Sequence, residues 1–192
     1  FGKTFCSPKS FNNFLGVPLS LSQLKTNHQF AVFEVGMSKA GEIHSLSKLI
    51  KPHIGIITNI GEAHIENFKN LNGIAKAKGE IINNIENHGT LILNRDDKYF
   101  NYFKKRAKLK NLRVISFGIS KKSDVYPISF KRNKKEKKLT LKICDQIIKI
   151  KVKNLNIQNI LATLTLLKVL NLNFFESASR FANFQLSEGR GK

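Results

Sequence analysis

Short apolar runs alternate with helical patterns along the first two thirds of the chain. Residues 30–33 and 54–57 are apolar runs of the length of a buried strand, whereas residues 43–50 place their apolar side chains at helical spacing. The predicted strands are residues 29–35, 54–57, 89–94 and 112–117, and the predicted helices are residues 19–24, 41–50, 98–107 and one that begins after Leu71. This alternation predicts a doubly wound α/β fold with a mostly parallel sheet.

The pattern changes after Ser123. Residues 125–130 and 139–143 flank a polar stretch, and residues 146–152 alternate apolar side chains with lysine. We therefore predict an antiparallel β-meander in residues 124–152, appended to the parallel sheet within one domain. A strongly apolar helix over residues 156–170 follows, because its apolar positions fall on one face. The residues expected on that face are Ile157, Ile160, Leu161, Leu164 and Leu167.

Two chemically useful side chains follow predicted strands. Glu34 comes directly after one apolar run, and His64 comes shortly after another. Ligands of open α/β sheets bind beyond the carboxyl ends of the strands, so this carboxylate and this imidazole could converge on a divalent cation. The alternative is that His64 is an ordinary hydrogen-bonded loop residue, and that Lys76 and Lys78 form the solvated face of the helix after Leu71.

Four sequence blocks resemble the central domain of the Mur ligases. They are EVGMS from Glu34, GEI from Gly41, TNIGEAH from Thr58 and AKAKGEI from Ala75. Their order agrees with that family, and the resemblance extends from about Asn12 to Arg190. Within the family, it is greatest to the ligases that add D-alanyl-D-alanine.

The resemblance implies an ATP-dependent, amide-forming ligase of peptidoglycan precursor synthesis in the cytoplasm. The carboxylate of a UDP-N-acetylmuramoyl-tripeptide would take the γ-phosphate of ATP, and the amine of D-alanyl-D-alanine would then displace phosphate from the acyl phosphate. The implied cofactors are ATP, Mg²⁺ and a carbamylated lysine made from CO₂, and a monomer is expected. Two relatives remain as alternatives, namely another Mur ligase or a folylpolyglutamate synthetase-like ligase.

The resemblance also implies roles for individual residues. Glu34, His64 and Lys78, the last as a carbamate, would hold Mg²⁺ and act in catalysis, while Lys76 would face solvent. The residues implied in nucleotide binding are Asn12, Asn13, Asn156, Asn159 and Arg190. The structural alternatives are a plain turn for the first two and a helix N-cap for Asn156. The chain departs from the family pattern at Lys153 and Leu155, where glycine and histidine are usual.

The formal net charge of +20 raises nucleic-acid binding as an alternative of another class. However, the lysines are scattered, their densest cluster at residues 131–138 has the pattern of a hairpin tip, and no basic stripe carries interleaved aromatics. No apolar run approaches the ~20 residues of a membrane span. Cys6 and Cys144 are far apart and are interpreted as reduced thiols.

Two further motifs suggest chemistry that we do not assign to them. Gly2-Lys3-Thr4 has the ending of a phosphate-binding loop, but Pro8 opposes the long helix that should follow it. We therefore expect the true loop to lie upstream of Phe1. Residues 1–192 would then be a partial central ATP-binding domain, without the family's N- and C-terminal domains and inactive by itself. Asp96 and Asp97 are expected to cap a helix rather than to bind a metal.

Overall fold

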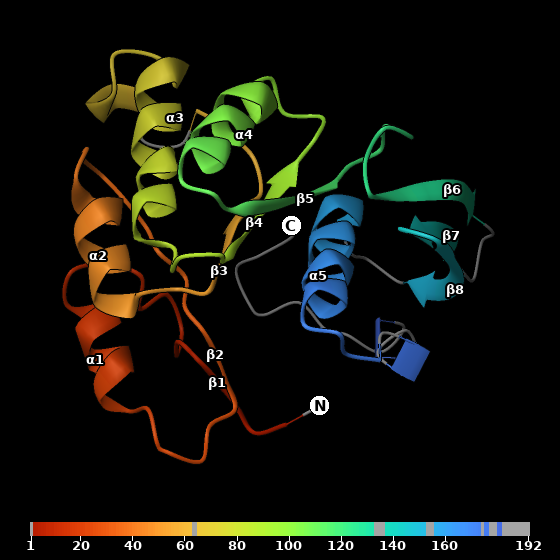
Figure 1. The fold of residues 1–192 in the computed structure, drawn as a ribbon, viewed down its shortest axis with the longest axis horizontal. Coiled ribbons are helices and arrows are strands. Elements are labelled where there is room, and N and C mark those ends of the chain that lie inside the picture. Colours follow the sequence, from red (N-terminus) through yellow and green to blue (C-terminus); the bar gives the residue numbers. More distant parts are fainter. Residues whose placement is uncertain are drawn as a thin grey trace. The chain divides into compact units, whose positions relative to one another are not determined.

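The computed structural model describes residues 2–62, 65–132, 137–152, 156–173, 175–176 and 180–181. The chain forms two compact units. The first contains Phe1–Leu91 and Asn101–Arg113, and the second contains Ile92–Phe100 and Val114–Lys192. Figure 1 shows the elements of both, which are described in turn below.

The first unit begins with a parallel β-α-β crossover. Strands β1 (Thr4–Cys6) and β2 (Phe30–Val32) pair in parallel and are joined through helix α1 (Gly16–Ser22). Strand β2 ends earlier than predicted because the following residues bond to the segment after β1, where the Asn12 carbonyl oxygen accepts from the Gly36 N–H at 2.7 Å. The Gly2-Lys3-Thr4 motif leads into β1 and not into a helix.

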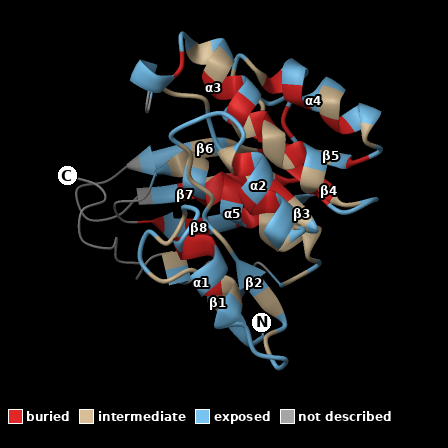
Figure 2. Cartoon of the chain, turned by 90° about the vertical axis from the view of Figure 1, so that its left-hand side faces the viewer, coloured by how far each residue is buried: buried red, intermediate tan, exposed pale blue. Residues whose placement is uncertain are grey.

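Two helices of the first unit contain parts of two of the four sequence blocks, GEI and AKAKGEI. Helix α2 (Glu42–Ile50) is followed by strand β3 (Ile54–Ile57), the short 3₁₀ helix η1 (Ile65–Asn67) and helix α3 (Leu71–Lys78). The Asn70 side chain caps α3 by accepting from the Gly73 N–H at 3.1 Å. Both helices carry buried residues, namely Ile43, Leu46 and Ser47 in α2 and Ile74, Ala75 and Ala77 in α3, and Figure 2 shows buried segments on α3 and around α2.

The helix predicted after Leu71 changes to a 3₁₀ helix, η2 (Gly79–Asn84), at Gly79. A Cβ atom at Gly79 would lie 2.6 Å from Arg106 Nη1 and 3.1 Å from the Phe103 ring. Both of these side chains belong to helix α4 (Phe100–Leu109), whose residues from Asn101 onward lie in the same unit. The glycine therefore permits the close packing of α4 against the start of η2.

Six strands form the main sheet, in the order β3-β4-β5-β6-β7-β8. Strands β4 (Thr90–Asn94) and β5 (Arg113–Phe117) follow β3, and every residue of β4 is buried. Strand β5 pairs in parallel with β6 (Val125–Arg132). This mixed α/β architecture, with an antiparallel section after the parallel strands, confirms the predicted fold class.

The second unit contains the predicted antiparallel meander. Strands β6, β7 (Lys137–Ile143) and β8 (Gln146–Val152) pair antiparallel, with Leu141 opposite Ile148. Burial alternates along β8, so that Ile148 and Ile150 lie in the core while Lys149 and Lys151 face outward. Helix α5 (Ile157–Val169) packs beside β6 and β7, as Figure 1 shows. Its residues Ile160, Leu161 and Leu164 are buried as predicted, and Ile157 and Leu167 are half-buried.

The turn after β4 contains two acidic residues, one of which bonds the backbone before α4, as predicted, while the other bonds the loop after β5. Asp97 Oδ1 accepts from the Tyr99 N–H at 2.8 Å, which prepares the start of α4. The Asp96 carboxylate accepts from the N–H groups of Ile119 and Ser120, so it also fixes the loop after β5. These acids are thus engaged in structural hydrogen bonds.

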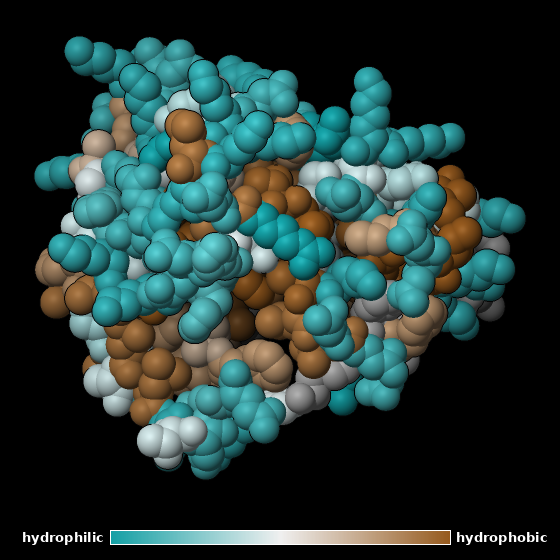
Figure 3. All heavy atoms as spheres, viewed as in Figure 1, coloured by the Kyte–Doolittle hydropathy of each residue, from teal (hydrophilic) through white to brown (hydrophobic). Residues whose placement is uncertain are grey.

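The surface combines exposed lysines with one apolar area of the first unit. Phe14, Leu15 and Leu19 at α1 and Val32 in β2 are all exposed by half or more. Figure 3 shows apolar surface in this region. The Cys6 side chain is exposed, and that of Cys144 is half-buried. None of the helices within the described ranges is both long and apolar enough to cross a membrane.

Candidate functional site

The carboxyl ends of β1 and β2 bring Asn12 and Glu34 together. Asn12 Nδ2 donates to Glu34 Oε1 at 3.0 Å, although the two residues are 22 positions apart. A Cβ atom at Gly36 would lie 3.0 to 3.1 Å from the atoms of the Asn12 side-chain amide, so a larger residue there would crowd this contact. Both Asn12 and Glu34 were predicted to bind ligands, and in the structure they form a hydrogen-bonded pair on the surface of the first unit.

The neighbouring Asn13 makes different contacts. Its Oδ1 accepts from the N–H groups of Leu15 at 3.1 Å and of Gly16 at 2.9 Å. These bonds satisfy amides at the start of α1, and they explain why this helix begins at Gly16 rather than at residue 19. Asn13 Oδ1 therefore has the turn role that the sequence allowed as the alternative.

Lys78 and the loop after β3 form the second half of the candidate site. Lys78 Nζ donates to the backbone oxygen of Asn59 at 3.0 Å. The Lys78 side chain is half-buried, while Lys76 is exposed and the intervening Ala77 is buried. The two lysines of the AKAKGEI block thus have different environments, and Lys78 is the one directed toward the carboxyl end of β3.

One apolar cluster connects these segments. Met37 and Ile60 pack against a cluster formed by Phe68, Ile74 and Ala77. Met37 follows Glu34 in the loop after β2, and Ile60 follows Asn59 in the loop after β3, while Ala77 precedes Lys78 in α3. Three of the predicted sequence blocks therefore share one core, and their polar residues are anchored to it.

Two carboxylates that the sequence did not identify connect α2 to this arrangement. Glu80 accepts from the Gly41 N–H at 2.8 Å and from the His44 N–H at 3.1 Å. Glu42 Oε2 accepts from the N–H groups of Ser38 and Lys39. The available signal was their position, because Glu42 lies in the GEI block and Glu80 in the AKAKGEI block. Gly41, the N-cap of α2, has no side chain that could bond the amides that Glu80 satisfies.

Two predicted site residues, His64 and Arg190, lie outside the described residues, as do Lys153 and Leu155. The expected approach of His64 to Glu34 therefore stays a prediction. Across the described part of the chain, no group of three or more His, Cys, Asp and Glu side chains gathers as a metal site. Of the three predicted metal ligands, the structure describes Glu34 and Lys78.

The two predicted asparagines of the second unit lie at the start of α5. Asn156 is its N-cap, and Asn156 Oδ1 accepts from the Gln158 N–H at 2.8 Å. Asn159 follows in the first turn and is exposed. The structural alternative for Asn156 is thus present, and its predicted contact with a nucleotide stays a prediction.

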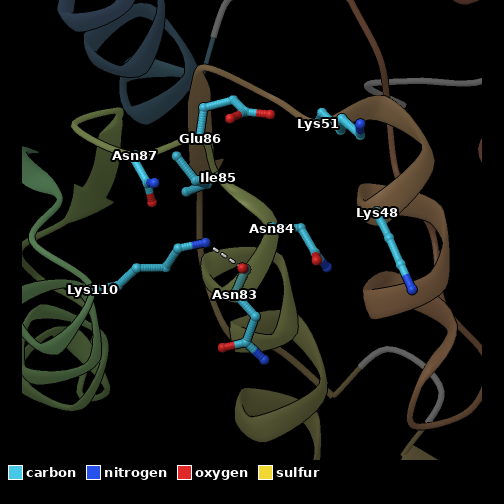
Figure 4. Close-up of a pocket in the computed structure, with 8 residues that line it drawn as sticks. All are labelled: Lys48, Lys51, Asn83, Asn84, Ile85, Glu86, Asn87 and Lys110. Atoms are coloured by element: carbon cyan, nitrogen blue, oxygen red, sulfur yellow. Dashed lines mark hydrogen bonds between the residues drawn. The ribbon is translucent and has the colours of Figure 1, made fainter.

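A shallow pocket of the first unit lies away from the candidate site, at the amino end of β3. Figure 4 shows its lining, with Lys110 Nζ hydrogen-bonded to the backbone oxygen of Asn83. Lys48 and Lys51 at the end of α2 and Lys110 just after α4 lie where the negative end of a helix dipole favours cations. We therefore assign these lysines a structural role.

A comparison with models of protein families identifies the family of the chain. The family model described as the Mur ligase middle domain matches residues 2–167. The chain belongs to the Mur ligase family. The predicted recognition, based on four sequence blocks, is thereby confirmed.

Individual Mur ligases agree with this assignment. The UDP-N-acetylmuramoyl-tripeptide–D-alanyl-D-alanine ligase of Rickettsia prowazekii is 34% identical over 194 residues, which cover 98% of this chain and 43% of that protein. The crystal structure of MurF from Acinetobacter baumannii has a TM-score of 0.91 at 28% identity, covering 99% of this chain and 42% of that one. This Mur ligase chain therefore spans less than half the length of either.

The folylpolyglutamate synthetase alternative is more distant. The apo form of L. casei FPGS has a TM-score of 0.59 at 15% identity and covers 76% of this chain and 36% of that one. Such a likeness shows a shared fold alone. Among the alternatives, a Mur ligase is favoured.

Proposed function

We propose that the protein containing this chain is an ATP-dependent ligase that joins D-alanyl-D-alanine to a UDP-N-acetylmuramoyl-tripeptide. The observation that carries the proposal is the shared core of the three sequence blocks, in which Met37, Ile60 and Ala77 anchor the segments bearing Glu34, Asn59 and Lys78. The name of the Rickettsia relative supports this choice of substrates.

The proposed reaction has two steps. The terminal carboxylate of the tripeptide attacks the γ-phosphorus of ATP, which forms an acyl phosphate and releases ADP. The amine of D-alanyl-D-alanine then attacks the acyl carbon, loses a proton and displaces phosphate, so that one amide bond replaces one phosphoanhydride bond. Because charge builds on phosphoryl oxygens, the protein contributes mainly by positioning groups and by neutralising charge.

The residues present fit a magnesium ion in their chemistry. Glu34 offers a carboxylate whose orientation is fixed by the 3.0 Å bond from Asn12, and oxygen ligands are those that Mg²⁺ prefers. His64 and Lys78 would complete the set by family resemblance. When bound, the ion would neutralise the negative charge of the phosphate groups. Asn12 would keep the Glu34 carboxylate in place during both steps.

The environment of Lys78 supports its modification to a carbamate. An ammonium group would repel a nearby cation, whereas a carbamate presents anionic oxygens to it. The carbamate nitrogen retains one N–H, so the bond from Lys78 Nζ to the Asn59 oxygen, at 3.0 Å, can persist after modification. Lys76, which is exposed, lacks this fixed position.

The remaining assignments complete the proposal. By family resemblance, the residues proposed for nucleotide binding are Asn12, Asn13, Asn156, Asn159 and Arg190. Asparagine amides can donate to and accept from a nucleotide base, which is the contact expected of the residues at the start of α5. The protein would act in the cytoplasm as a monomer, on soluble UDP-linked precursors and without nucleic acid.

The test is a direct assay of the protein that contains this chain. It is incubated with ATP, Mg²⁺, a UDP-N-acetylmuramoyl-tripeptide and D-alanyl-D-alanine, and the product is identified by mass spectrometry. We expect ADP and the pentapeptide product in equal amounts, and loss of both in Glu34→Gln. Glutamylation of a folate in place of this product would favour the synthetase alternative. Salt-sensitive binding of DNA without any ligase activity would favour the nucleic-acid alternative.

A further inference from the structure

We propose that Glu80 is a positioning residue for this reaction, because its carboxylate holds the loop that carries Glu34 in place relative to Lys78. The role rests on the proposed function and assigns a task to a residue that lies outside the expected metal and nucleotide sets. Glu80 lies two positions after Lys78, on the 3₁₀ helix that directly continues α3. The contacts of the Glu80 carboxylate therefore also constrain the position of Lys78.

The contacts of Glu80 reach across the unit. One carboxylate oxygen accepts from the Gly41 N–H at 2.8 Å and the other from the His44 N–H at 3.1 Å. Both oxygens are therefore bonded to the first turn of α2, where the helix dipole also favours a negative charge. Gly41 has φ of 88°, in the left-handed region, and supplies no capping side chain of its own. Glu80 provides the missing cap from another segment of the chain.

A second carboxylate, that of Glu42, connects α2 to the loop that carries Glu34. Glu42, the first residue of α2, accepts from the N–H groups of Ser38 and Lys39. The opposite end of the same loop is held by Asn12, which bonds both Glu34 and Gly36. The loop between Glu34 and α2 is thus fixed at its start by Asn12 and at its end by Glu42. Glu80 fixes the helix on which that end depends.

The magnitudes separate positioning from simple stabilisation. A helix cap contributes about 1 kcal/mol, so its loss leaves most of a domain's free energy of unfolding intact. A displacement of about 1 Å of a reacting or metal-binding group can lower a rate by about a hundredfold. Loss of the Glu80 contacts is therefore expected to affect the rate more than the stability.

The first experiment measures the contacts themselves in the 192-residue chain. Backbone amide hydrogen exchange is followed by NMR in Glu80→Ala and in Glu86→Gln. The second variant also removes one negative charge, but from the far end of the same segment, where the carboxylate lines the shallow pocket. We expect the Gly41 and His44 amides to exchange about tenfold faster in Glu80→Ala and to be unchanged in Glu86→Gln. Unchanged exchange in both variants would overturn the proposal.

The second experiment measures the reaction in the protein that contains this chain. In Glu80→Ala, we expect kcat to fall about tenfold or more and the Mg²⁺ concentration for half-maximal rate to rise, with the KM for D-alanyl-D-alanine within about twofold of the wild type. Glu80→Gln keeps one acceptor oxygen and should lie between Glu80→Ala and the wild type. Glu86→Gln should match the wild type.

The outcomes distinguish this role from the proposed function. Faster exchange at Gly41 and His44 with unchanged kcat and Mg²⁺ dependence would overturn the positioning role and leave the ligase intact. A wild-type protein that makes no amide product would overturn the proposed function, and the positioning role with it, whatever the exchange experiment finds about the cap. If circular dichroism shows that Glu80→Ala does not fold, Glu80→Gln becomes the deciding variant. A kcat of Glu80→Gln equal to that of the wild type would then overturn the positioning role.

Discussion

At the scale of single residues, the two lysines of α3 differ in environment although only one residue separates them. Lys78 is half-buried and donates to Asn59, whereas Lys76 is exposed. We expect Lys78→Ala to lower the ligase rate by about a hundredfold or more with the fold retained, because alanine is well tolerated in a helix. Steady-state rates and circular dichroism measure these effects.

Two controls accompany the Lys78→Ala prediction. Short carboxylic acids added in solution should restore part of the rate, since they can present oxygens where the carbamate was, and Lys76→Ala should stay near the wild type. If Lys76→Ala were inactive and Lys78→Ala had normal activity, the carbamate would be assigned to Lys76. Full activity in both would remove the site assignment altogether.

Adjacent asparagines give a second prediction at this scale. Asn12 orients Glu34, whereas Asn13 satisfies the first amides of α1. We expect Asn12→Ala to raise the Mg²⁺ requirement with little change in the free energy of unfolding. Asn13→Ala should instead lower the free energy of unfolding by about 1 kcal/mol. Urea titration and Mg²⁺-dependent rates measure the two effects, and a shared pattern in both variants would contradict the division of roles.

Site residues were predictable only where a motif or a strand end marked them. Glu34 and Lys78 stand in such places, and the structure anchors both to one apolar cluster. Glu80 lies in the AKAKGEI block, but its role was not predicted, because its partners are backbone amides 36 and 39 positions away. The contact of Lys78 with the Asn59 carbonyl oxygen could not be predicted either, since every residue has a backbone carbonyl.

At the scale of elements, the periodicity located the longer helices and strands of the described chain, and local hydrogen bonds moved their ends. It missed the short strand β1 and the 3₁₀ helix η1, which have three residues each. Strand β3 has the predicted bounds, because apolar residues alone define it. Helix α1 begins earlier than predicted, at the amides that the Asn13 side chain accepts from, and the helix after Leu71 becomes 3₁₀ at Gly79, where α4 packs closely. Such ends depend on capping and tertiary packing, which a hydrophobic pattern does not contain.

The start of α5 provides a prediction that separates capping from binding. Asn156 caps this helix through Oδ1, while Asn159 is exposed one turn along. Asn156→Ala should lower the free energy of unfolding by about 1 kcal/mol, as for other N-caps. Asn159→Ala should leave stability unchanged and raise the KM for ATP. Urea unfolding and ATP titrations measure these effects, and an unchanged KM in Asn159→Ala would contradict its predicted contact with the nucleotide.

At the scale of the whole molecule, the fold class followed from the order of elements, whereas the charge of +20 pointed toward a class of partner that the family does not support. Composition reports the average over the surface and not the chemistry of a site. The mixed sheet was predictable in outline because helices separate the predicted parallel strands, whereas only short polar stretches separate the antiparallel ones. The parallel pairing of β5 with β6 had no such signal, because no helix joins them. The division of the chain into two units had no such signal.

The activity of the chain by itself provides the prediction at this scale. Gly2-Lys3-Thr4 leads into β1, so its amides do not lie at the start of a helix as those of a phosphate-binding loop do. We expect the 192-residue chain to form no amide product with ATP and both substrates, measured by mass spectrometry. Product formation at the rate of a protein that also contains the relatives' other segments would show that this chain holds a complete catalytic site.

Strand β8 is the last strand in the order of the main sheet, and its outward residues include Lys149 and Lys151. An edge strand presents backbone groups that can pair with a strand from another molecule, and charged side chains along such an edge oppose this pairing by repulsion. Two copies brought edge to edge would set like charges opposite one another. We therefore expect the lysines of β8 to oppose aggregation through sheet extension at high protein concentration, and to do so less as salt screens their charges.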